Sequence, residues 1–162
     1  MFTAAARSIG GTLRHEVDVN GRHTIVTDEP ERLGGTDTGP APHELMAAML
    51  AACASTMIVL YARQRDWHLS DVQVEVRYDA DVTPREVYMT VHLPDGLTDG
   101  QIERLRRVAR TCPARRALEA GFAFDEQITL DVRDRALSGR CSTAGRAAAA
   151  PTSRAGRSAS RA

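Results

Sequence analysis

The segment from Leu45 to Ala62 is almost entirely apolar, and it constrains the fold more than any other part of this 162-residue chain. Its length is just sufficient for a transmembrane helix. However, Cys53 lies in its middle, and no second segment could accompany it in a bilayer. A helix that is apolar on all sides in a soluble domain must be surrounded by protein. We therefore predict a central core helix from about Pro42 to Arg65, with a transmembrane helix as the less favoured alternative.

The segments on either side alternate between strand and helix patterns, which predicts one α+β domain over residues 1–134. Asn20-Gly21 favours a tight hairpin turn, and Thr98 with Gln101 forms a capping box at a helix start. The expected elements are a hairpin at 13–27, an irregular loop at 28–42, strands at 72–77 and 87–93, helices at 98–110 and 113–120, and a last strand at 128–132.

Residues 135–162 consist mainly of alanine, arginine, serine, glycine and threonine, so they have little to bury and we expect a disordered tail. The tail carries six arginines and no acid, which leaves 15 basic against 21 acidic residues in the domain. An acidic domain argues against a nucleic-acid surface. For the basic tail, a solvated extension without a role is favoured over contact with nucleic acid or an acidic surface. Cys141 lies in the tail and is not placed in the site.

The first residues, from Met1 to Arg7, lack the pattern of a secretory signal, so we expect a cytoplasmic protein. In a reducing compartment, cysteines are more often free, metal-binding or catalytic than paired in structural disulfides. The sequence contains no nucleotide-binding, zinc-protease or serine-hydrolase motif, and its five histidines lack the spacing of metal ligands. Cys53 and Cys112 therefore remain as the residues that could carry chemistry.

Cys112 has the sequence context of a reactive thiol. Pro113 suits the first position of a helix, which places Cys112 at the N-cap, where unpaired amides and the helix dipole stabilise a thiolate. Cysteine statistics alone favour the simpler interpretation that Cys53 and Cys112 are small buried hydrophobic residues. The N-cap position reverses that preference for Cys112.

Four short segments form a recognisable set: Gly39–Leu45 (GPAPHEL), Ala51-Ala52-Cys53, Ala109–Pro113 (ARTCP), and Asp28-Glu29-Pro30 with Gly34-Gly35. Taken together, these segments resemble the OsmC/Ohr family of organic hydroperoxide reductases, and the last of them is similar to one branch of that family. The resemblance covers roughly residues 19–132, and the tail has no counterpart.

The resemblance implies an OsmC-like fold of two intertwined chains, in which antiparallel sheets wrap around central helices. It implies a homodimer with each active site at the subunit interface. Periodicity alone does not predict this arrangement, but the two agree, because one small sheet could hardly cover an all-round apolar helix without a second subunit.

The resemblance also implies a reaction without a metal or organic cofactor. Cys53 would be the peroxidatic cysteine and Cys112 the resolving cysteine, and an external thiol reductant, a dithiol or a lipoylated protein, would reopen their disulfide. A guanidinium should polarise the departing oxygen. Arg32 lies nearest the position used in one branch of the family, and Arg22 is its competitor; either could instead be a solvated arginine.

The acid of the family's organic hydroperoxide members would fall on His43, and Glu44 occupies the next position. Nine residues of one straight helix correspond to roughly 13 Å of rise and a rotation near 180°, so Glu44 cannot meet Cys53 within it. If Glu44 serves an active site, we expect that site to be the partner subunit's. Its alternative role is to complement the positive end of the helix.

We therefore expect a cysteine-based peroxidase that reduces organic hydroperoxides, with hydrogen peroxide as a second candidate substrate. Apolar neighbours of Cys53, such as Met49 and Met57, favour the organic substrate. One alternative is a non-catalytic protein that binds a small hydrophobic ligand at the interface. The other is a redox sensor whose disulfide changes a contact with a partner.

Overall fold

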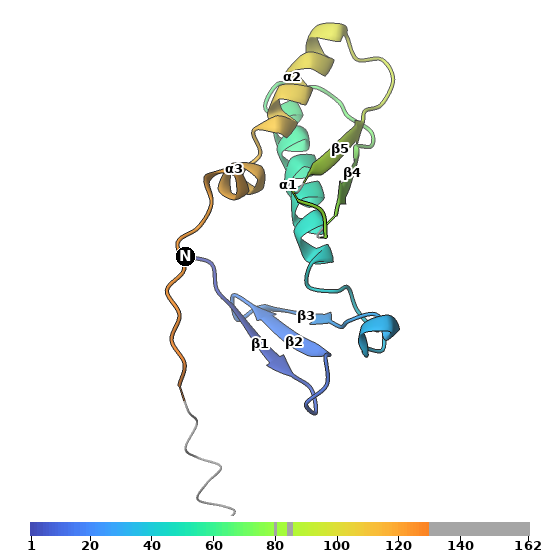
Figure 1. The fold of residues 1–162 in the computed structure, drawn as a ribbon. Helices are drawn as coiled ribbons and strands as arrows, with labels where there is room; N and C mark the ends of the chain where they lie inside the picture. Colours follow the sequence, from blue (N-terminus) through green and yellow to red (C-terminus); the bar gives the residue numbers. More distant parts are fainter. Residues whose placement is uncertain (80, 84–85, 130–162) are drawn as a thin grey trace, which may run out of the picture. The chain divides into compact units, whose positions relative to one another are not determined.

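The computed structural model describes residues 1–79, 81–83 and 86–129 (Figure 1). Helices and antiparallel strands occur together, which confirms the predicted α+β class. Contacts within the chain define a compact unit from Met1 to Ala123 and a second unit that begins at Phe124. The elements are β1 (Ala4–Ser8), β2 (His15–Val19), β3 (His23–Thr27), the 3-10 helix η1 (Glu31–Leu33), α1 (Glu44–Arg63), β4 (Gln73–Tyr78), β5 (Val87–His92), α2 (Asp99–Arg110) and α3 (Pro113–Ala120).

The N-terminal sheet has the antiparallel order β1-β2-β3. Its predicted hairpin is confirmed, because Asn20 and Gly21 both adopt positive φ angles, of 56° and 65°, between β2 and β3. Strand β1 was not predicted, since its sequence AAARS shows no alternation of apolar and polar residues. It forms by pairing with β2, with Ala6 opposite Val17.

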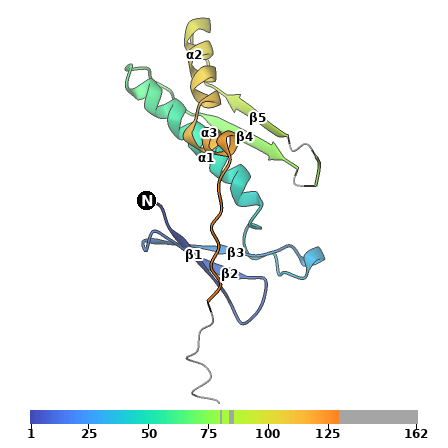
Figure 2. The same cartoon turned by 60° about the vertical axis from the view of Figure 1, so that its left-hand side comes forward.

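The second sheet consists of β4 and β5, and both views show it alongside α1 (Figures 1 and 2). Val74 lies opposite Val91, and alternate residues of β4 are half-buried, as the sequence pattern predicts. The core between this sheet and the helices is centred on Ile58 of α1 and on Leu105 and Ala109 of α2. This packing holds α1 and α2 together and so fixes the start of α3.

Helix α1 is buried along only one line of its surface in a single chain. The buried residues are Leu50, Ala54, Ile58 and Ala62, which recur every fourth position. Met49 and Leu60 are each 44% exposed, so one chain does not provide the enclosure that an all-round apolar helix requires. Helix α1 is long and apolar enough to cross a membrane by length and composition, a test that the core helix of a soluble protein also passes. The chain is not a clear membrane protein.

The two C-terminal helices begin as the sequence predicts. The backbone N–H of Gln101 donates to the Thr98 hydroxyl (3.3 Å), and the N–H of Thr98 donates to Gln101 Oε1 (2.8 Å), which completes the capping box of α2. Helix α3 has Pro113 in its first turn and ends at Gly121, whose φ is 75°. The short connection between α2 and α3 therefore sets the position of Cys112.

The predicted last strand is wrong for the part of it that the structure describes. Ile128 belongs to no strand and is 94% exposed, and residues 130–132 lie outside the described residues. The alternating apolar residues favour a strand, but a strand also needs a neighbouring edge for its backbone hydrogen bonds. The predicted tail at 135–162, with Cys141, and the domain boundary at 134 also lie outside the described residues.

Candidate functional site

The fold brings Cys53 and Cys112 together. Cys53 lies near the middle of α1, and Cys112 immediately precedes α3, which contacts α1. The two thiols are free, and they lie close enough together that Cys53 raises the pKa of Cys112. Cys53 is half-buried, whereas Cys112 is completely buried in the single chain. Two thiols that lie close together are candidates for a disulfide.

Cys112 occupies the N-cap of α3, as the sequence predicts. Its backbone is extended, with φ −61° and ψ 146°, and its carbonyl accepts a hydrogen bond from the N–H of Arg116 (3.1 Å). Pro113 follows in the first turn, where the missing N–H of proline costs nothing. The chain thus turns sharply at Cys112 and directs its side chain toward α1.

Burial dominates the ionisation of Cys112 and raises the pKa of its thiol above the ordinary value. The backbone N–H groups of Arg115 and Ala114 act in the opposite direction, and the neighbouring Cys53 thiol raises the pKa further. The prediction that Cys112 is a stabilised thiolate is therefore wrong for the reduced protein. The amides at the start of α3 do lower the pKa of Cys112, but the loss of solvent outweighs them.

Arg32 and Glu44 lie together, apart from the two cysteines. Both line a cavity of about 480 Å³, together with His43 and Tyr78, and neither cysteine lines it. Arg32 is exposed on η1, and Glu44 is exposed at the start of α1. Within one chain, the four predicted site residues therefore form two separate pairs, one of cysteines and one of Arg32 with Glu44.

Helix α1 explains why these pairs are separate. It runs without interruption from Glu44 through Cys53, so the predicted separation of the two side chains is confirmed. The Glu44 carboxylate folds back and accepts a hydrogen bond from the N–H of Ala41 (2.9 Å). Arg22, the competitor of Arg32, is exposed beside the β2–β3 turn and does not line the cavity.

The loop that carries Arg32 is held by Asp28, a residue for which the sequence predicted no structural role. Its side chain is 1% exposed. One carboxylate oxygen accepts hydrogen bonds from both the N–H and the hydroxyl of Thr36 and of Thr38, over 2.6 to 3.2 Å. These bonds, led by the Thr36 hydroxyl, hold the pKa of Asp28 well below its usual range, although burial opposes them. The TDT sequence at 36–38 was the only signal for this network.

Two glycines allow the same loop to fold tightly against the preceding chain. A Cβ atom at Gly35 would lie 1.8 Å from the carbonyl oxygen of Glu29, and one at Gly39 would lie 2.6 Å from that of Val26. Backbone atoms cannot move aside as the end of a side chain can. The predicted ordered path of this glycine-rich loop is thus confirmed.

Metal-binding groups do not gather in the described part of the chain, where no three His, Cys, Asp or Glu side chains lie close enough to hold an ion. The chemistry that the described side chains offer is that of two neighbouring thiols, with a guanidinium and a carboxylate elsewhere on the chain. That the reaction needs no cofactor stays a prediction.

Comparisons with known proteins identify the family to which this fold belongs. The family profile of OsmC-like proteins matches residues 35–127, more than half of the chain. Among curated protein sequences no match was found. A crystal structure of an organic hydroperoxide resistance protein OsmC from Legionella pneumophila is 27% identical, with a TM-score of 0.56 over 73% of this chain and 88% of that one.

Two other solved structures share the fold. A Psychrobacter arcticus protein, named for an osmotic stress induced and detoxification response, is 26% identical, with a TM-score of 0.62 over 72% of this chain and 87% of that one. An organic hydroperoxide resistance protein from Elizabethkingia anophelis is 22% identical, with a TM-score of 0.56 over 72% and 86%. From the profile match and this shared fold, the chain belongs to the OsmC family, which includes organic hydroperoxide resistance proteins.

Proposed function

We propose that this protein is a thiol-dependent peroxidase that reduces organic hydroperoxides through a disulfide cycle between Cys53 and Cys112. The proximity of these two thiols, which come from separate elements of the fold, is the observation that carries the proposal. The names of similar proteins point in the same direction, since two of them are organic hydroperoxide resistance proteins.

The cycle begins at Cys53, because its sulfur is the more accessible of the two. Its thiolate attacks one peroxide oxygen, so that an S–O bond forms and the O–O bond breaks. The departing oxygen takes a proton and leaves as an alcohol, and Cys53 becomes a sulfenic acid. Cys112 then attacks this sulfur and expels water, which leaves a disulfide. An external thiol reductant returns two electrons and two protons.

Burial of Cys112 suits the resolving role. Its raised pKa favours the neutral thiol before the peroxide reacts. A buried neutral thiol is a poor competitor for the peroxide, because the thiolate is the nucleophile. The two cysteines thereby take different roles although they lie close together.

A second copy of the chain completes the proposed site. Arg32 and Glu44 line one cavity, and the continuous helix α1 keeps Glu44 away from Cys53 of its own chain. A homodimer would place this pair beside the cysteines of the partner, where the guanidinium polarises the departing oxygen. Exposed apolar side chains on α1, Met49 and Leu60 among them, supply a surface for that dimer.

Apolar surroundings favour an organic peroxide over hydrogen peroxide in this proposal. The residues of α1 around Cys53 are mostly alanine, leucine and methionine, so a hydrocarbon group gains from desolvation there. The resting state has free thiols, and a cytoplasmic location would keep them reduced.

Stopped-flow oxidation of the reduced protein by cumene hydroperoxide and by hydrogen peroxide tests the proposal, with mass spectrometry of the product. We expect fast oxidation, faster with cumene hydroperoxide, that ends in a Cys53–Cys112 bridge and is abolished in Cys53→Ser. Oxidation no faster than that of a free thiol would overturn the peroxidase. The non-catalytic binding of a small hydrophobic ligand would then be the better interpretation.

A further inference from the structure

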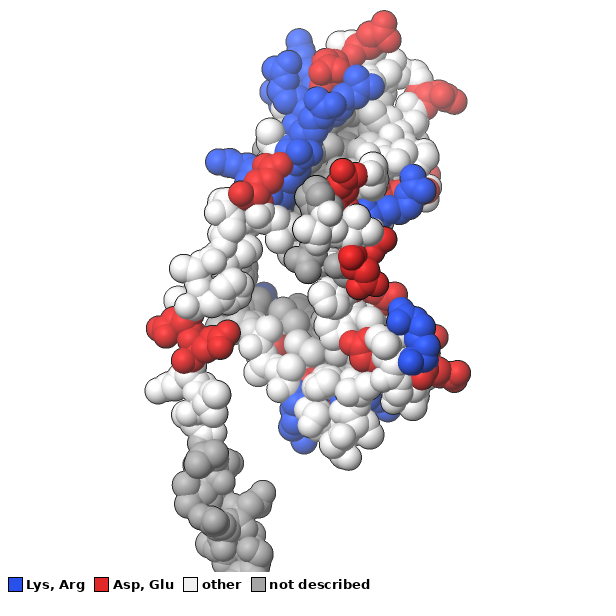
Figure 3. Space-filling model, viewed as in Figure 1, with Lys and Arg blue, Asp and Glu red and all other residues white. Residues whose placement is uncertain are grey.

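Helices α2 and α3 concentrate positive charge on a domain that is otherwise acidic. Residues 99–120 carry six arginines against three acids, whereas residues 1–134 as a whole carry 15 basic and 21 acidic residues. The space-filling view shows the basic side chains gathered over α2 (Figure 3). We call this surface the basic face; its arginines are Arg104, Arg106, Arg107, Arg110, Arg115 and Arg116.

Much of this charge is not neutralised within the described residues. Arg106 pairs with Glu103 (2.8 Å), and Arg115 pairs with Glu119 (2.7 Å). The other four arginines of the basic face are exposed and form no ion pair with the described part of the chain. Exposed guanidinium groups on one surface attract an acidic partner and hold carboxylates through paired hydrogen bonds.

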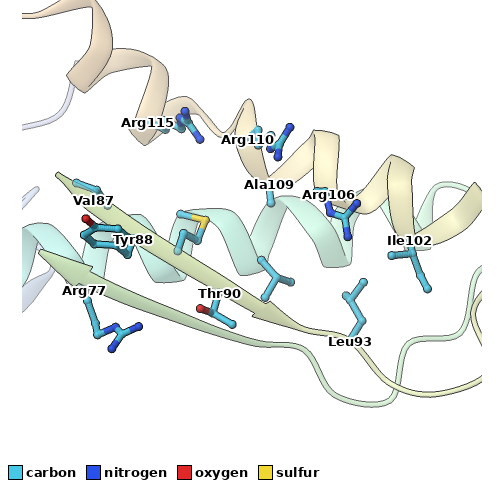
Figure 4. Close-up of a pocket in the computed structure, with 12 residues that line it drawn as sticks. Arg77, Val87, Tyr88, Thr90, Leu93, Ile102, Arg106, Ala109, Arg110 and Arg115 are labelled. Atoms are coloured by element: carbon cyan, nitrogen blue, oxygen red, sulfur yellow. The ribbon is translucent and has the colours of Figure 1, made fainter. Parts of the chain in front are cut away.

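A cavity of about 500 Å³ opens between the basic face and strand β5. Arg106, Arg110 and Arg115 lie on its helical side, and strand β5 with Val87 lies opposite them (Figure 4). Met89 and Val91 of β5 also line the cavity. Arginines beside an apolar surface match a peptide segment that has both acidic and apolar side chains.

In the sequence, arginines of the basic face flank Cys112, one of the two cysteines of the proposed cycle. Cys112 lies at the connection between α2 and α3, between Arg110 and Arg115. The backbone N–H of Arg115 lowers the pKa of the Cys112 thiol, and the Arg115 side chain lines the cavity. A partner docked on the basic face would therefore lie beside the proposed disulfide.

We propose that the basic face docks an acidic partner protein that carries a dithiol and reopens the Cys53–Cys112 disulfide. This inference rests on the proposed peroxidase cycle. A thiolate of the partner attacks the more accessible sulfur, Cys53, and the bond to Cys112 breaks. Cys112 leaves as a thiolate at the N-terminal end of α3, where the helix dipole favours negative charge, and then takes a proton. The second thiol of the partner then displaces Cys53, and the partner departs as a disulfide.

Nucleic acid is the other class of polyanion that arginines could attract. The apolar residues of β5 in the cavity and the adjacent Cys112 favour a protein that takes part in thiol exchange. Phosphate contacts would use the arginines but neither of these features. The experiment below includes a DNA duplex to separate the two.

The test measures reopening of the disulfide in the full chain after oxidation with diamide, so that it does not depend on peroxide chemistry. The reductants are two synthetic peptides with the same Cys-Gly-Pro-Cys dithiol, one flanked by glutamates and one by lysines, and neutral dithiothreitol. We expect the acidic peptide to react about tenfold faster than the basic one at low salt, and the difference to shrink at high salt.

Charge reversal locates the docking surface. Arg107→Glu with Arg110→Glu should remove most of the advantage of the acidic peptide and leave the rate with dithiothreitol unchanged. The milder pair Arg107→Gln with Arg110→Gln should give an intermediate loss, and circular dichroism reports whether both fold. Arg14→Glu, which removes an exposed arginine far along the chain from the basic face, is the matched control.

Equal rates with both peptides, or an equal loss in Arg14→Glu, would overturn the docking surface. Tight, salt-sensitive binding of the DNA duplex to the basic face, without any preference for the acidic peptide, would also overturn it. Failure of diamide to form the disulfide would overturn it as well. Absence of the proposed peroxidase activity would give a different result from absence of the docking surface. In that case the diamide-formed disulfide still reopens with the expected charge preference, but peroxides do not oxidise Cys53.

Discussion

The thiol of Cys53, within helix α1, lies close enough to Cys112 at the N-cap of α3 to raise the pKa of the Cys112 thiol. Cys112 is fully buried and Cys53 is half-buried. If the two cysteines have the roles proposed above, Cys112→Ser should still react with cumene hydroperoxide at a rate close to that of the wild type, because only Cys53 meets the peroxide. The product should stop at the sulfenic acid, which dimedone labelling and mass spectrometry detect.

Turnover with a dithiol reductant separates this prediction from a general loss of reactivity. Cys53→Ser should show neither dimedone labelling nor turnover. Cys112→Ser should differ from the wild type only in that it forms no intramolecular bridge. A slow first oxidation in Cys112→Ser would contradict the assignment, since it would mean that Cys112 activates or performs the attack on the peroxide.

The Asp28 carboxylate predicts how the stability of the protein depends on pH. Hydrogen bonds from Thr36 and Thr38 lower its pKa in the folded state, relative to about 3.9 in the unfolded chain. The folded state therefore binds fewer protons than the unfolded state, and the stabilisation is complete above pH ~4 and is lost as the pH falls further. Urea unfolding between pH 3 and pH 7 should show this loss in the wild type.

Asp28→Asn provides the control for that measurement. Its urea midpoint at pH 7 should be lower than that of the wild type, because an amide cannot accept the same set of bonds. Its midpoint should also fall less between pH 5 and pH 3. An equally steep fall in both proteins would show that other carboxylates set the acid sensitivity.

How far the sequence predicts this structure depends on the range of each signal. The Asn20-Gly21 turn and the Thr98–Gln101 capping box were predictable because each needs only neighbouring residues. The network around Asp28 was not, because its partners lie eight and ten residues away in an irregular loop without periodicity. Strand β1 exists only through pairing with β2, and its own sequence does not indicate it.

The candidate site follows the same rule. The Cys112-Pro113 pair predicted an N-cap from two adjacent residues, and the structure has it. The ionisation of Cys112 was predicted wrongly because helix amides are visible in the sequence, whereas burial depends on packing against other elements. That Arg32 shares a cavity with Glu44 also depends on the tertiary path of the loop.

Gly35 tests whether the tight loop matters for the site. In Gly35→Ala, the new Cβ would collide with the carbonyl oxygen of Glu29, so the loop must shift. We expect a loss of about 1–3 kcal/mol in the free energy of unfolding, and slower oxidation of Cys53 because Arg32 lies on the same loop. The matched control is Gly100→Ala in α2, where nothing lies within 4 Å of the added carbon. That variant should be about as stable as the wild type or gain ~0.5 kcal/mol.

Subunit complementation tests whether Arg32 serves the cysteines of the partner. Arg32→Gln should oxidise slowly and Cys53→Ser not at all, while Arg22→Gln should resemble the wild type. A heterodimer of Arg32→Gln and Cys53→Ser chains, purified with two different tags, contains one site with an intact Cys53 and an intact Arg32 if the two come from different subunits.

Such a heterodimer should therefore show about half the wild-type rate of peroxide reduction, since a symmetric dimer has two equivalent sites and one of them is restored. If Arg32 instead acted within its own chain, the Cys53 that remains would lack its arginine and the heterodimer would stay as slow as Arg32→Gln. A loss of activity in Arg22→Gln rather than in Arg32→Gln would transfer the role to the arginine beside the β2–β3 turn. Because the cavity that holds Arg32 also holds Glu44 and neither cysteine, we expect the restored rate.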